Sequence, residues 1–193
     1  MEIRQYEPND EIGWVRCRVL SFLDTAYFDN VLTEKETYQN PSIELVAVED
    51  GQIVGLLDIE YDNSENVVCT RSEGLGGMIW HIATHPDYQR RGIGRKLLEE
   101  AERTAKEKGL VYLEAWTRDD EWVNEWYQKN GFKKVSSYLH VILEGKEVED
   151  VITVEKPSFK VMQAFAHYSG DEKDNIKSKF NRVHECNCYI KNI

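Results

Sequence analysis

The sequence lacks any run of apolar residues that could cross a membrane. Its longest apolar runs, such as IELVAV and IVGLL, are far shorter than the ~20 residues that a spanning helix needs. The opening stretch, MEIRQYEPND, also lacks the apolar core of a secretory signal peptide. We therefore expect a cytoplasmic protein with no membrane partner.

Basic residues are fewer than acidic residues in this sequence. The chain has 24 lysine and arginine residues against 35 aspartate and glutamate residues, which gives a formal net charge of -11. Such a charge repels nucleic-acid phosphates and anionic lipids, so we expect no nucleic-acid partner. A cationic small molecule is a more natural partner.

Metal-binding signatures are also missing. The cysteines form no CxxC pair and no second pair that would complete a zinc site; they are Cys17, Cys69, Cys186 and Cys188. His140 and His167 have no cluster of cysteines and carboxylates beside them at ligand spacing. We therefore expect reduced thiols and no metal ion.

No internal repeat and no low-complexity linker divides the chain, and its 193 residues can share one hydrophobic core. We therefore expect a single domain over 1–193. Its first segment, EIRQY, predicts a strand, and Asn9 or Asp10 can cap the helix that follows. Two apolar runs on either side of Asp50-Gly51 predict a β-hairpin.

The middle of the chain predicts a βαβ unit. GGMIWHIAT has the pattern of a buried strand, and an amphipathic helix follows that ends at Gly109. LVYLEAWT is then a second strand, parallel to the first because a helical crossover joins them. A short helix in DDEWVNEWYQKNGF, a strand in KKVSSYLHVILEG and a last strand in RVHECNCYIKNI complete the order of elements.

Residues 145–180 are harder to interpret. The sequence predicts a helix around Val161 to His167, followed by a charged loop. An insertion of this length is often a lid or a dimer surface, so a homodimer stays open.

A glycine-containing basic turn, HPDYQRRGIG, begins the long helix. Gly92 and Gly94 let the backbone approach an anion, and the helix N-terminus offers unpaired N–H groups. The turn is rich in basic side chains, which are Arg90, Arg91, Arg95 and Lys96. It lacks both the GK[ST] end of a P-loop and the third glycine of a dinucleotide fingerprint, so we infer a different pyrophosphate site.

These residues resemble a known family. The spacing Gln89-x-x-Gly92-x-Gly94 is similar to the acetyl-CoA-binding signature of the GNAT superfamily, and NEWYQKNGF resembles the second motif of that family. The resemblance runs from about residue 1 to residue 144 and includes the last strand. It implies an α+β (α/β) GNAT fold with a mixed central sheet of about seven strands, flanking helices and an insertion before the last strand. The implied function is N-acetyl transfer from acetyl-CoA to a primary amine, expected on a small cationic molecule.

The resemblance also implies a cofactor site. The backbones of Ile82, Ala83 and Thr84 are expected to bind the pantetheine arm, with Gln89 at the first position of the motif. The pyrophosphate is expected on the backbone amides of Arg90, Arg91, Gly92, Ile93, Gly94 and Arg95. Asn124 lies on the same helical face as Tyr127 and is expected near the cofactor. The asparagine that the family commonly places seven residues before the tyrosine is replaced here by Asp120.

Acetyl transfer to an amine needs a general acid and a general base. Tyr127 matches the tyrosine of the family and, with a reference pKa of about 10, can protonate a thiolate whose conjugate acid has a pKa near 8.5. The predicted strand GGMIWHIAT carries no carboxylate, and His81 is its one titratable side chain. His81 is therefore a candidate base, although core packing is the commoner role of such a histidine. Glu114 and Glu73 are rival bases.

Acidic residues near the expected strand ends offer either a site for a cationic amine or a solvated rim; they are Asp58, Glu60, Asp62, Asp119 and Asp120. Tryptophans crowd the same region, where they stack on a substrate or pack in the core; they are Trp116, Trp122 and Trp126. Two alternative functions stay open, which are acetylation of a protein or peptide and non-catalytic binding of acyl-CoA.

Overall fold

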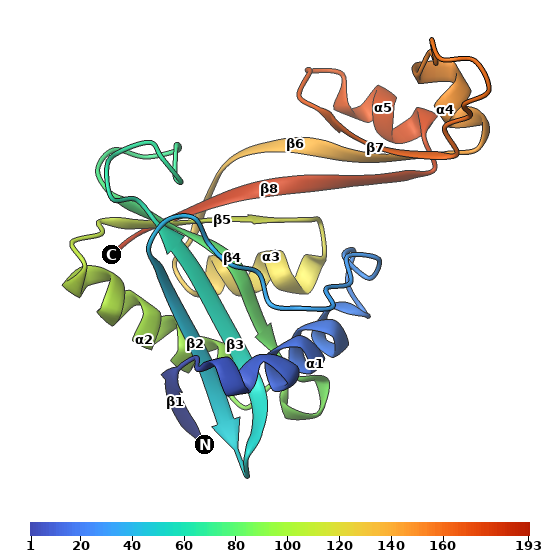
Figure 1. Ribbon diagram of the computed structural model, residues 1–193. Helices are drawn as coiled ribbons and strands as arrows, with labels where there is room; N and C mark the ends of the chain where they lie inside the picture. Colours follow the sequence, from blue (N-terminus) through green and yellow to red (C-terminus); the bar gives the residue numbers. More distant parts are fainter.

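The computed structural model describes residues 1–193 and consists of one mixed eight-stranded sheet with helices on both faces (Figure 1). The strand order is β1-β2-β3-β4-β5-β8-β6-β7. The strands are β1 Glu2–Gln5, β2 Ser42–Glu49, β3 Gln52–Tyr61, β4 Gly76–Thr84, β5 Tyr112–Thr117, β6 Lys133–Glu144, β7 Gln163–Tyr168 and β8 Arg182–Asn192. The α-helices are α1 Glu11–Phe22, α2 Ile93–Glu107, α3 Glu121–Lys129, α4 Lys146–Val151 and α5 Lys173–Lys179. Two short 3-10 helices, η1 Pro8–Asp10 and η2 Pro86–Tyr88, precede α1 and α2.

The predicted β-hairpin is confirmed between β2 and β3. Asp50 and Gly51 both have positive φ angles, 52° and 76°, which is the backbone conformation that a two-residue hairpin turn requires. Alternate residues of these strands point to opposite faces of the sheet. Leu57 packs in the core under α2, and its neighbour Leu56 packs under α1.

The predicted βαβ unit is also confirmed. Strand β4 pairs in parallel with β5, and α2 connects them. Helix α2 buries one apolar face on the sheet, made of Leu97, Leu98, Ala101 and Ala105. It covers the same face as α3, whereas α1 covers the opposite face.

Strands β4 and β5 separate partway along their length. They pair only as far as Ile79 opposite Ala115. The register of β4 with β3 shifts beyond that point, and Trp80 has no partner in the ladder. The edge of β4 after Ile79 therefore faces β5 without a hydrogen-bonding strand.

The prediction for residues 145–180 was wrong. The stretch around Val161 to His167 is not a helix but the strand β7, and α5 forms in the stretch expected to be a charged loop. The burial of β7 alternates, with Ala164 and Ala166 turned inward and Phe165 and His167 turned outward. Pairing with β6 along six residues outweighs the helical propensity of the alanines. The sheet accordingly has eight strands where about seven were expected.

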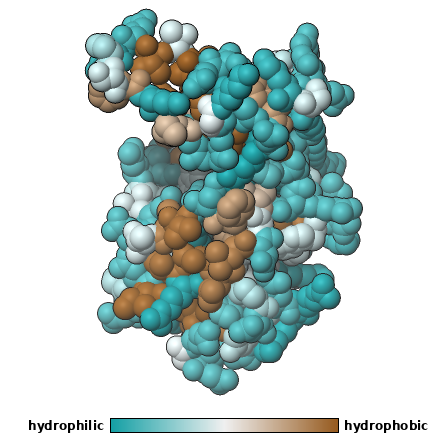
Figure 2. Space-filling view, turned by 90° about the vertical axis from the view of Figure 1, so that its right-hand side faces the viewer, coloured by the Kyte–Doolittle hydropathy of each residue, from teal (hydrophilic) through white to brown (hydrophobic).

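Strands β6, β7 and β8 extend past the rest of the sheet as an arm that carries α4 and α5 at its tip (Figure 1). A separate small core stabilises the arm and includes Leu139, Val141, Leu143 and Val148. Figure 2 shows apolar side chains gathered on the face that carries α1, with a recess between this body and the arm. The exposed apolar residues of this face include Ile12, Leu20, Leu23, Phe28 and Val31.

All four cysteines are buried as free thiols. No group of three or more histidine, cysteine, aspartate or glutamate side chains is arranged to hold a metal ion. None of the helices combines the length and the apolar character that crossing a bilayer requires.

Candidate active site

The turn before α2 forms a concave backbone surface with free N–H groups. Gly92 is the N-cap of the helix with a φ of 78°, and Arg90 also has a positive φ of 61°. The amides of the first turn have no acceptor within the helix, so they are free for an anion. Arg91 and Arg95 form exposed ion pairs with Glu49 and Glu99, which leaves the backbone as the main anion-binding element.

The end of β4 lies beside this turn. One edge of the segment from Ile82 to Thr84 pairs with β3, and the other edge has no strand partner. The Thr84 carbonyl accepts hydrogen bonds from the Ser21 hydroxyl at 2.9 Å and from Gln89 Nε2 at 3.4 Å. Gln89 therefore ties the turn to the strand. The binding of pantetheine and pyrophosphate by these residues stays a prediction.

Tyr127 lies on α3 and stacks on Tyr189, the β8 residue that pairs with Ala115 of β5, so its ring lies near the point where β5 separates from β4. The ring stacks on Tyr189 with centroids 5.3 Å apart and contacts Phe132 edge-on. Its hydroxyl makes no hydrogen bond within the protein. Burial, with a smaller contribution from Tyr189, raises the pKa of Tyr127 well above its usual range, so the phenol stays protonated near neutral pH.

Asn124 is occupied by contacts within the protein. Its Nδ2 donates to the carbonyls of Arg118 and Asp120, and its Oδ1 accepts from Asn187 and Tyr189. These four bonds use the full capacity of the side-chain amide. The expected cofactor contact of Asn124 would require some of them to break, so we assign it a role in fixing the start of α3 to β8.

Glu114 does not face the gap, and the expectation that it acts as a base does not fit its position. Its side chain points to the opposite side of β5, where it is 1% exposed. The carboxylate accepts hydrogen bonds from the amides of Thr70 and Arg71 and from Trp116 Nε1. Glu114 thus holds the loop between β3 and β4 in place. Glu73 is an exposed residue of the same loop.

His81 has a partner that the sequence did not indicate. Its Nε2 lies 2.6 Å from Oε2 of Glu36, and its Nδ1 is buried with no hydrogen-bond partner. The imidazole packs edge-on against Trp14. The hydrogen bond to His81 lowers the pKa of Glu36, whose side chain is 47% exposed. A buried imidazole is thereby connected to solvent through a carboxylate.

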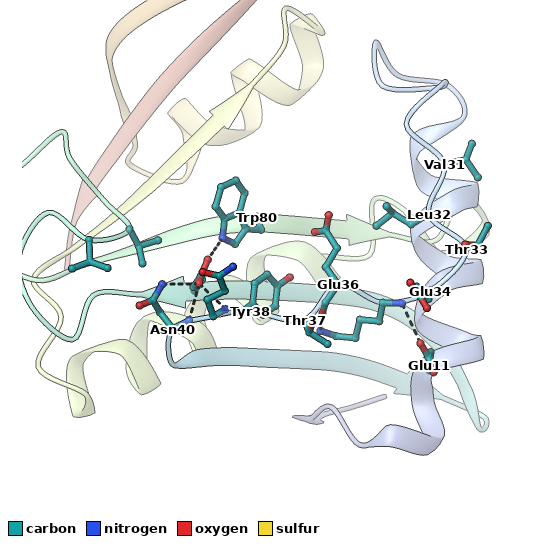
Figure 3. A pocket seen from close by; sticks show the side chains of 15 residues that line it. Glu11, Val31, Leu32, Thr33, Glu34, Glu36, Thr37, Tyr38, Asn40 and Trp80 are labelled. Atoms are coloured by element: carbon teal, nitrogen blue, oxygen red, sulfur yellow. Dashed lines mark hydrogen bonds between the residues drawn. The ribbon is translucent and has the colours of Figure 1, made fainter. Parts of the chain in front are cut away.

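Glu36 lies in a cavity of about 900 Å³ between the segment after α1 and strands β3 and β4 (Figure 3). Trp80 and Glu36 face the same space in this view. Three further carboxylates line the cavity, which are Glu11, Glu34 and Glu60. The one lysine in the lining, Lys35, is paired with Glu44 at 2.6 Å and with Asp58 at 3.1 Å. The cavity is therefore acidic.

The predicted acidic rim does not exist as such, because hydrogen-bond donors of the protein occupy its carboxylates. Asp58 is fully buried against Lys35 and Tyr38, and Glu60 accepts from Asn40 and Trp80. Asp62 accepts three backbone amides of the loop between β3 and β4 and the amide of Gly76 at the start of β4.

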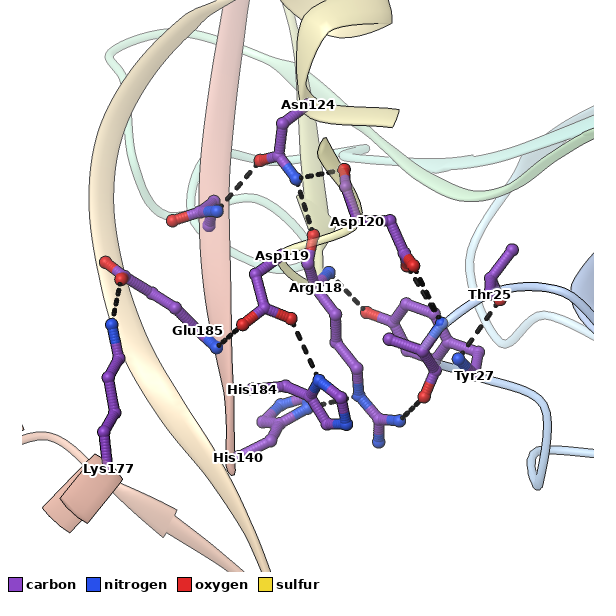
Figure 4. A network of polar contacts seen from close by, with 12 residues as sticks. Thr25, Tyr27, Arg118, Asp119, Asp120, Asn124, His140, Lys177, His184 and Glu185 are labelled. Carbon is purple, nitrogen blue, oxygen red and sulfur yellow. Dashed lines mark hydrogen bonds and ion pairs between the residues drawn. The ribbon is translucent and has the colours of Figure 1, made fainter. Parts of the chain in front are cut away.

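The two remaining aspartates of the expected rim connect separate elements (Figure 4). Asp119 contacts His184 Nδ1 at 2.9 Å and accepts the amide of Glu185 at 3.0 Å, which fixes it to β8. Asp120 accepts the amide of Ala26 and so anchors the segment after α1.

Two of the three tryptophans expected in this region pack against other residues, and the third is exposed. Trp116 packs on Tyr138, and Trp126 packs beside Gly94 at the start of α2. Trp122 is 55% exposed.

Comparisons with known proteins find acetyltransferases among the similar sequences. A family model described as an acetyltransferase (GNAT) domain matches residues 40–134. An acetyltransferase of Sodalis glossinidius is 29% identical over 156 residues, which cover 78% of this chain and 98% of that protein.

Solved structures share the fold. A GNAT-family acetyltransferase from Streptococcus pneumoniae matches with a TM-score of 0.61 at 20% identity, covering 100% of this chain and 98% of that one. The PaiA N-acetyltransferase of Thermoplasma acidophilum, solved in complex with coenzyme A, matches with a TM-score of 0.54 at 18% identity and covers 69% of this chain and 90% of its own. At such identities the structures establish the fold alone. The family model and the curated relative support a GNAT-family, acetyl-CoA-dependent N-acyltransferase, and the solved structures share its fold.

Proposed function

We propose that this enzyme transfers the acetyl group of acetyl-CoA directly to a primary amine of a small molecule, with Tyr127 as the general acid. One observation carries the proposal: the gap between β4 and β5 lies beside the free edge of β4, the first turn of α2 and Tyr127. Acetyl-CoA held along that edge has its thioester carbonyl next to the hydroxyl of Tyr127 and its pyrophosphate next to the free amides of the turn before α2.

The cofactor would bind mainly through the backbone. The peptide groups of Ile82 to Thr84 are available to the amides of the pantetheine arm, as an edge strand is available to another strand. The amides from Arg90 to Arg95 are available to the pyrophosphate, where the dipole of α2 adds to the attraction.

The reaction moves two protons, one to the departing sulfur and one from the attacking amine. The amine nitrogen attacks the thioester carbonyl, a tetrahedral intermediate forms, and the C–S bond breaks. The departing sulfur takes the proton of the Tyr127 hydroxyl, which is free of other hydrogen-bond partners and protonated near neutral pH. The resulting phenolate is a strong base because burial raises the pKa of Tyr127, and it then regains a proton from solvent. The proton lost by the amine goes to the pair formed by Glu36 and His81.

The acidic cavity supports an ammonium group as the arriving form of the acceptor. Glu11, Glu34 and Glu36 line it, while the charge of Lys35 is already paired. Carboxylates attract the cation before reaction, and the Glu36–His81 pair can then take its proton.

The test is release of free coenzyme A thiol from acetyl-CoA with a panel of polyamines, aminoglycosides, amino acids and basic peptides. We expect Tyr127→Phe to lower kcat by about 10²-fold or more with little change in acetyl-CoA affinity. Tyr168→Phe, which loses a hydroxyl on the arm, is the matched control and should keep full turnover.

Unchanged kcat in Tyr127→Phe would disprove the role of this residue as the acid. A response to peptides alone would indicate a protein acceptor. Silence across the whole panel with intact acetyl-CoA binding would contradict the proposed acceptor class.

A further inference from the structure

A second cavity lies between the body and the arm and has no role in the function proposed above. Its volume is about 620 Å³, and it is bounded by the segment after α1, by the residue that follows β5 and by strands β6 and β7. Its lining includes Tyr27, Val31, Arg118, His140, Ile142 and Phe165. Val31 also lines the acidic cavity, so the two cavities are neighbours.

Arg118 is buried in the wall of this cavity and is held from three sides (Figure 4). The residue is 6% exposed. Its Nε donates to His140 Nδ1 at 3.0 Å, its Nη1 donates to the carbonyl of Ala26, and its guanidinium carbon lies 4.3 Å from the centre of the Tyr27 ring. The orientation of the guanidinium is thus fixed before any ligand arrives.

One nitrogen of this guanidinium, Nη2, has no acceptor in the protein. The carboxylate paired with Arg118 is that of Asp29, whose Oδ1 lies 3.9 Å from Nη1, beyond hydrogen-bond distance. Asp29 turns its other oxygen to Arg182 at 2.8 Å. His140 does not neutralise the charge of Arg118, because its imidazole is uncharged near neutral pH. Burial, followed by the charge of Arg118, lowers the pKa of His140 to about 4.

A buried cation that is only partly neutralised is costly unless an anion completes its contacts. Two arginines share one aspartate here, in a protein whose net charge is -11. The protein therefore balances the positive charge of Arg118 only in part. The Nη2 nitrogen is the part of the guanidinium that a ligand can reach.

The chemistry of the cavity selects among anions. A planar guanidinium matches a carboxylate in a two-point contact. The nearby charge of Asp29 disfavours a doubly charged phosphate. Val31, Ile142 and Phe165 give the cavity apolar walls, which suit a hydrocarbon body attached to the carboxylate.

The location connects this site to acetyl transfer. Arg118 directly follows β5, and β5 has already separated from β4 after the pairing of Ala115 with Ile79. The cavity therefore lies beside the gap in which we place the thioester. A molecule whose carboxylate meets Arg118 can direct an amine toward that gap.

We propose that Arg118 binds the carboxylate of the acceptor, which makes the acceptor an apolar molecule that carries both a primary amine and a carboxylate, as an amino acid does. The inference rests on the proposed function and narrows its amine to this class. The ammonium group is the cationic end of the acceptor, and the carboxylate at Arg118 is its other end.

Matched pairs of amino acids and their carboxamides test this, since the amide keeps the shape and removes the charge. With leucine against leucinamide and phenylalanine against phenylalaninamide, we expect kcat/KM at least tenfold higher for the acids. In Arg118→Gln this preference should fall to about one, mainly through a higher KM of the acid. Arg103→Gln removes an exposed arginine of α2 and should keep the preference. Equal or better use of the amides by the unaltered enzyme would overturn the inference.

Arg118 also supports Ala26 and His140, so its substitution can disturb folding. A second measurement needs no variant and no turnover: calorimetric titration of the unaltered enzyme with 3-phenylpropionate and with 3-phenylpropionamide. Binding of the carboxylate at least tenfold tighter than the amide is the expected result, and equal affinities would contradict the inference. Carboxylate binding without acetylation of any amine would refute the proposed function alone, whereas acetylation that ignores the carboxylate would refute this inference alone.

Discussion

Glu36 lies between α1 and β2, in a segment with no helix or strand, yet its carboxylate meets His81 on β4 at 2.6 Å. The carboxylate is half-exposed and the imidazole is buried, so the pair spans the boundary between the acidic cavity and the core. A carboxylate beside an imidazole orients the ring and stabilises its protonated form, which is the arrangement a base needs.

The two residues are expected to act as one unit. Glu36→Gln and His81→Gln should each lower kcat by about 10²-fold, and the double variant should lose little more than either single one, since each substitution already breaks the pair. Steady-state kinetics at saturating acetyl-CoA measure this. Glu65→Gln, on the exposed loop after β3, is the control and should turn over normally. Losses that multiply in the double variant would show two independent roles.

A glycine with a positive φ lies at each end of α2. Gly92 at its start and Gly109 just past its end have φ angles of 78° and 82°, and nothing lies within 4 Å of a Cβ added at either. The two glycines therefore carry the same conformational demand, but only Gly92 lies in the proposed pyrophosphate site.

Alanine at either glycine should cost about 1 kcal/mol of stability, because a left-handed backbone is unfavourable for a residue with a Cβ. Only Gly92→Ala should also raise the Kd of acetyl-CoA, several-fold, since a relaxed turn no longer directs its amides at one point. Urea unfolding and calorimetry separate the two effects. Equal cofactor affinity in the two variants would place the pyrophosphate elsewhere.

On the arm, Glu185 of β8 binds α5 to the sheet. Its carboxylate contacts Lys177 at 2.8 Å and the Ser137 hydroxyl at 2.7 Å, and these contacts lower its pKa to about 2 from an ordinary value of 4.5. The folded state thus favours the charged form. Its contribution to stability is present above about pH 4.5 and is lost as the pH falls towards 2.

We therefore expect the free energy of unfolding to fall less between pH 7 and pH 3 in Glu185→Gln than in the unaltered protein. Urea titrations at the two pH values measure the difference. Glu155→Gln, which removes an exposed carboxylate with no hydrogen bond, should fall as far as the unaltered protein. An unchanged pH dependence in Glu185→Gln would contradict the role of this contact.

Elements with a strong local pattern could be predicted from the sequence, and those set by pairing could not. The turn at Asp50-Gly51 and the amphipathic face of α2 carry their own signals. Strand β7 does not, because the alanines in QAFAHY favour a helix. Pairing with the neighbouring strand β6 is what makes this segment a strand with alternating burial. Helix α5 has no buried residue and depends on contacts such as Lys177 with Glu185.

Two of the four apolar cores of the molecule serve different ends of the sheet. The larger core joins α2 and α3 to strands β2 to β5, and the smaller one holds the arm together. Leu97 belongs to the first and Leu143 to the second, and both are buried. The proposed cofactor site therefore depends on one core and not on the other.

Leu97→Ala and Leu143→Ala should each destabilise the protein by about 2–5 kcal/mol, since both leave a cavity. Only Leu97→Ala should also weaken acetyl-CoA binding, because it loosens α2 beneath its N-terminal turn. Chemical denaturation and calorimetry of the folded variants provide the comparison. Weaker cofactor binding in Leu143→Ala would mean that the arm takes part in the cofactor site.

The sequence could indicate the parts of the site that lie in short motifs, but not the contacts between residues that are distant in the chain. The glycine turn and Tyr127 carry short motifs, so they could be named in advance. The contact of Glu36 with His81 joins residues 45 positions apart and has no local pattern. The carboxylates of Asp58 and Asp62 look available in the sequence, but the fold directs an ammonium group and backbone amides at them.

Backbone amide NMR or hydrogen exchange of the protein with and without acetyl-CoA tests most directly whether the thioester binds between β4 and β5. We predict shifts and protection concentrated at residues 82–84 and 90–95, with smaller changes at the amide of Tyr127. Binding that leaves these amides unchanged and alters another surface instead would contradict the placement of the thioester between β4 and β5, and with it the mechanism built on that placement.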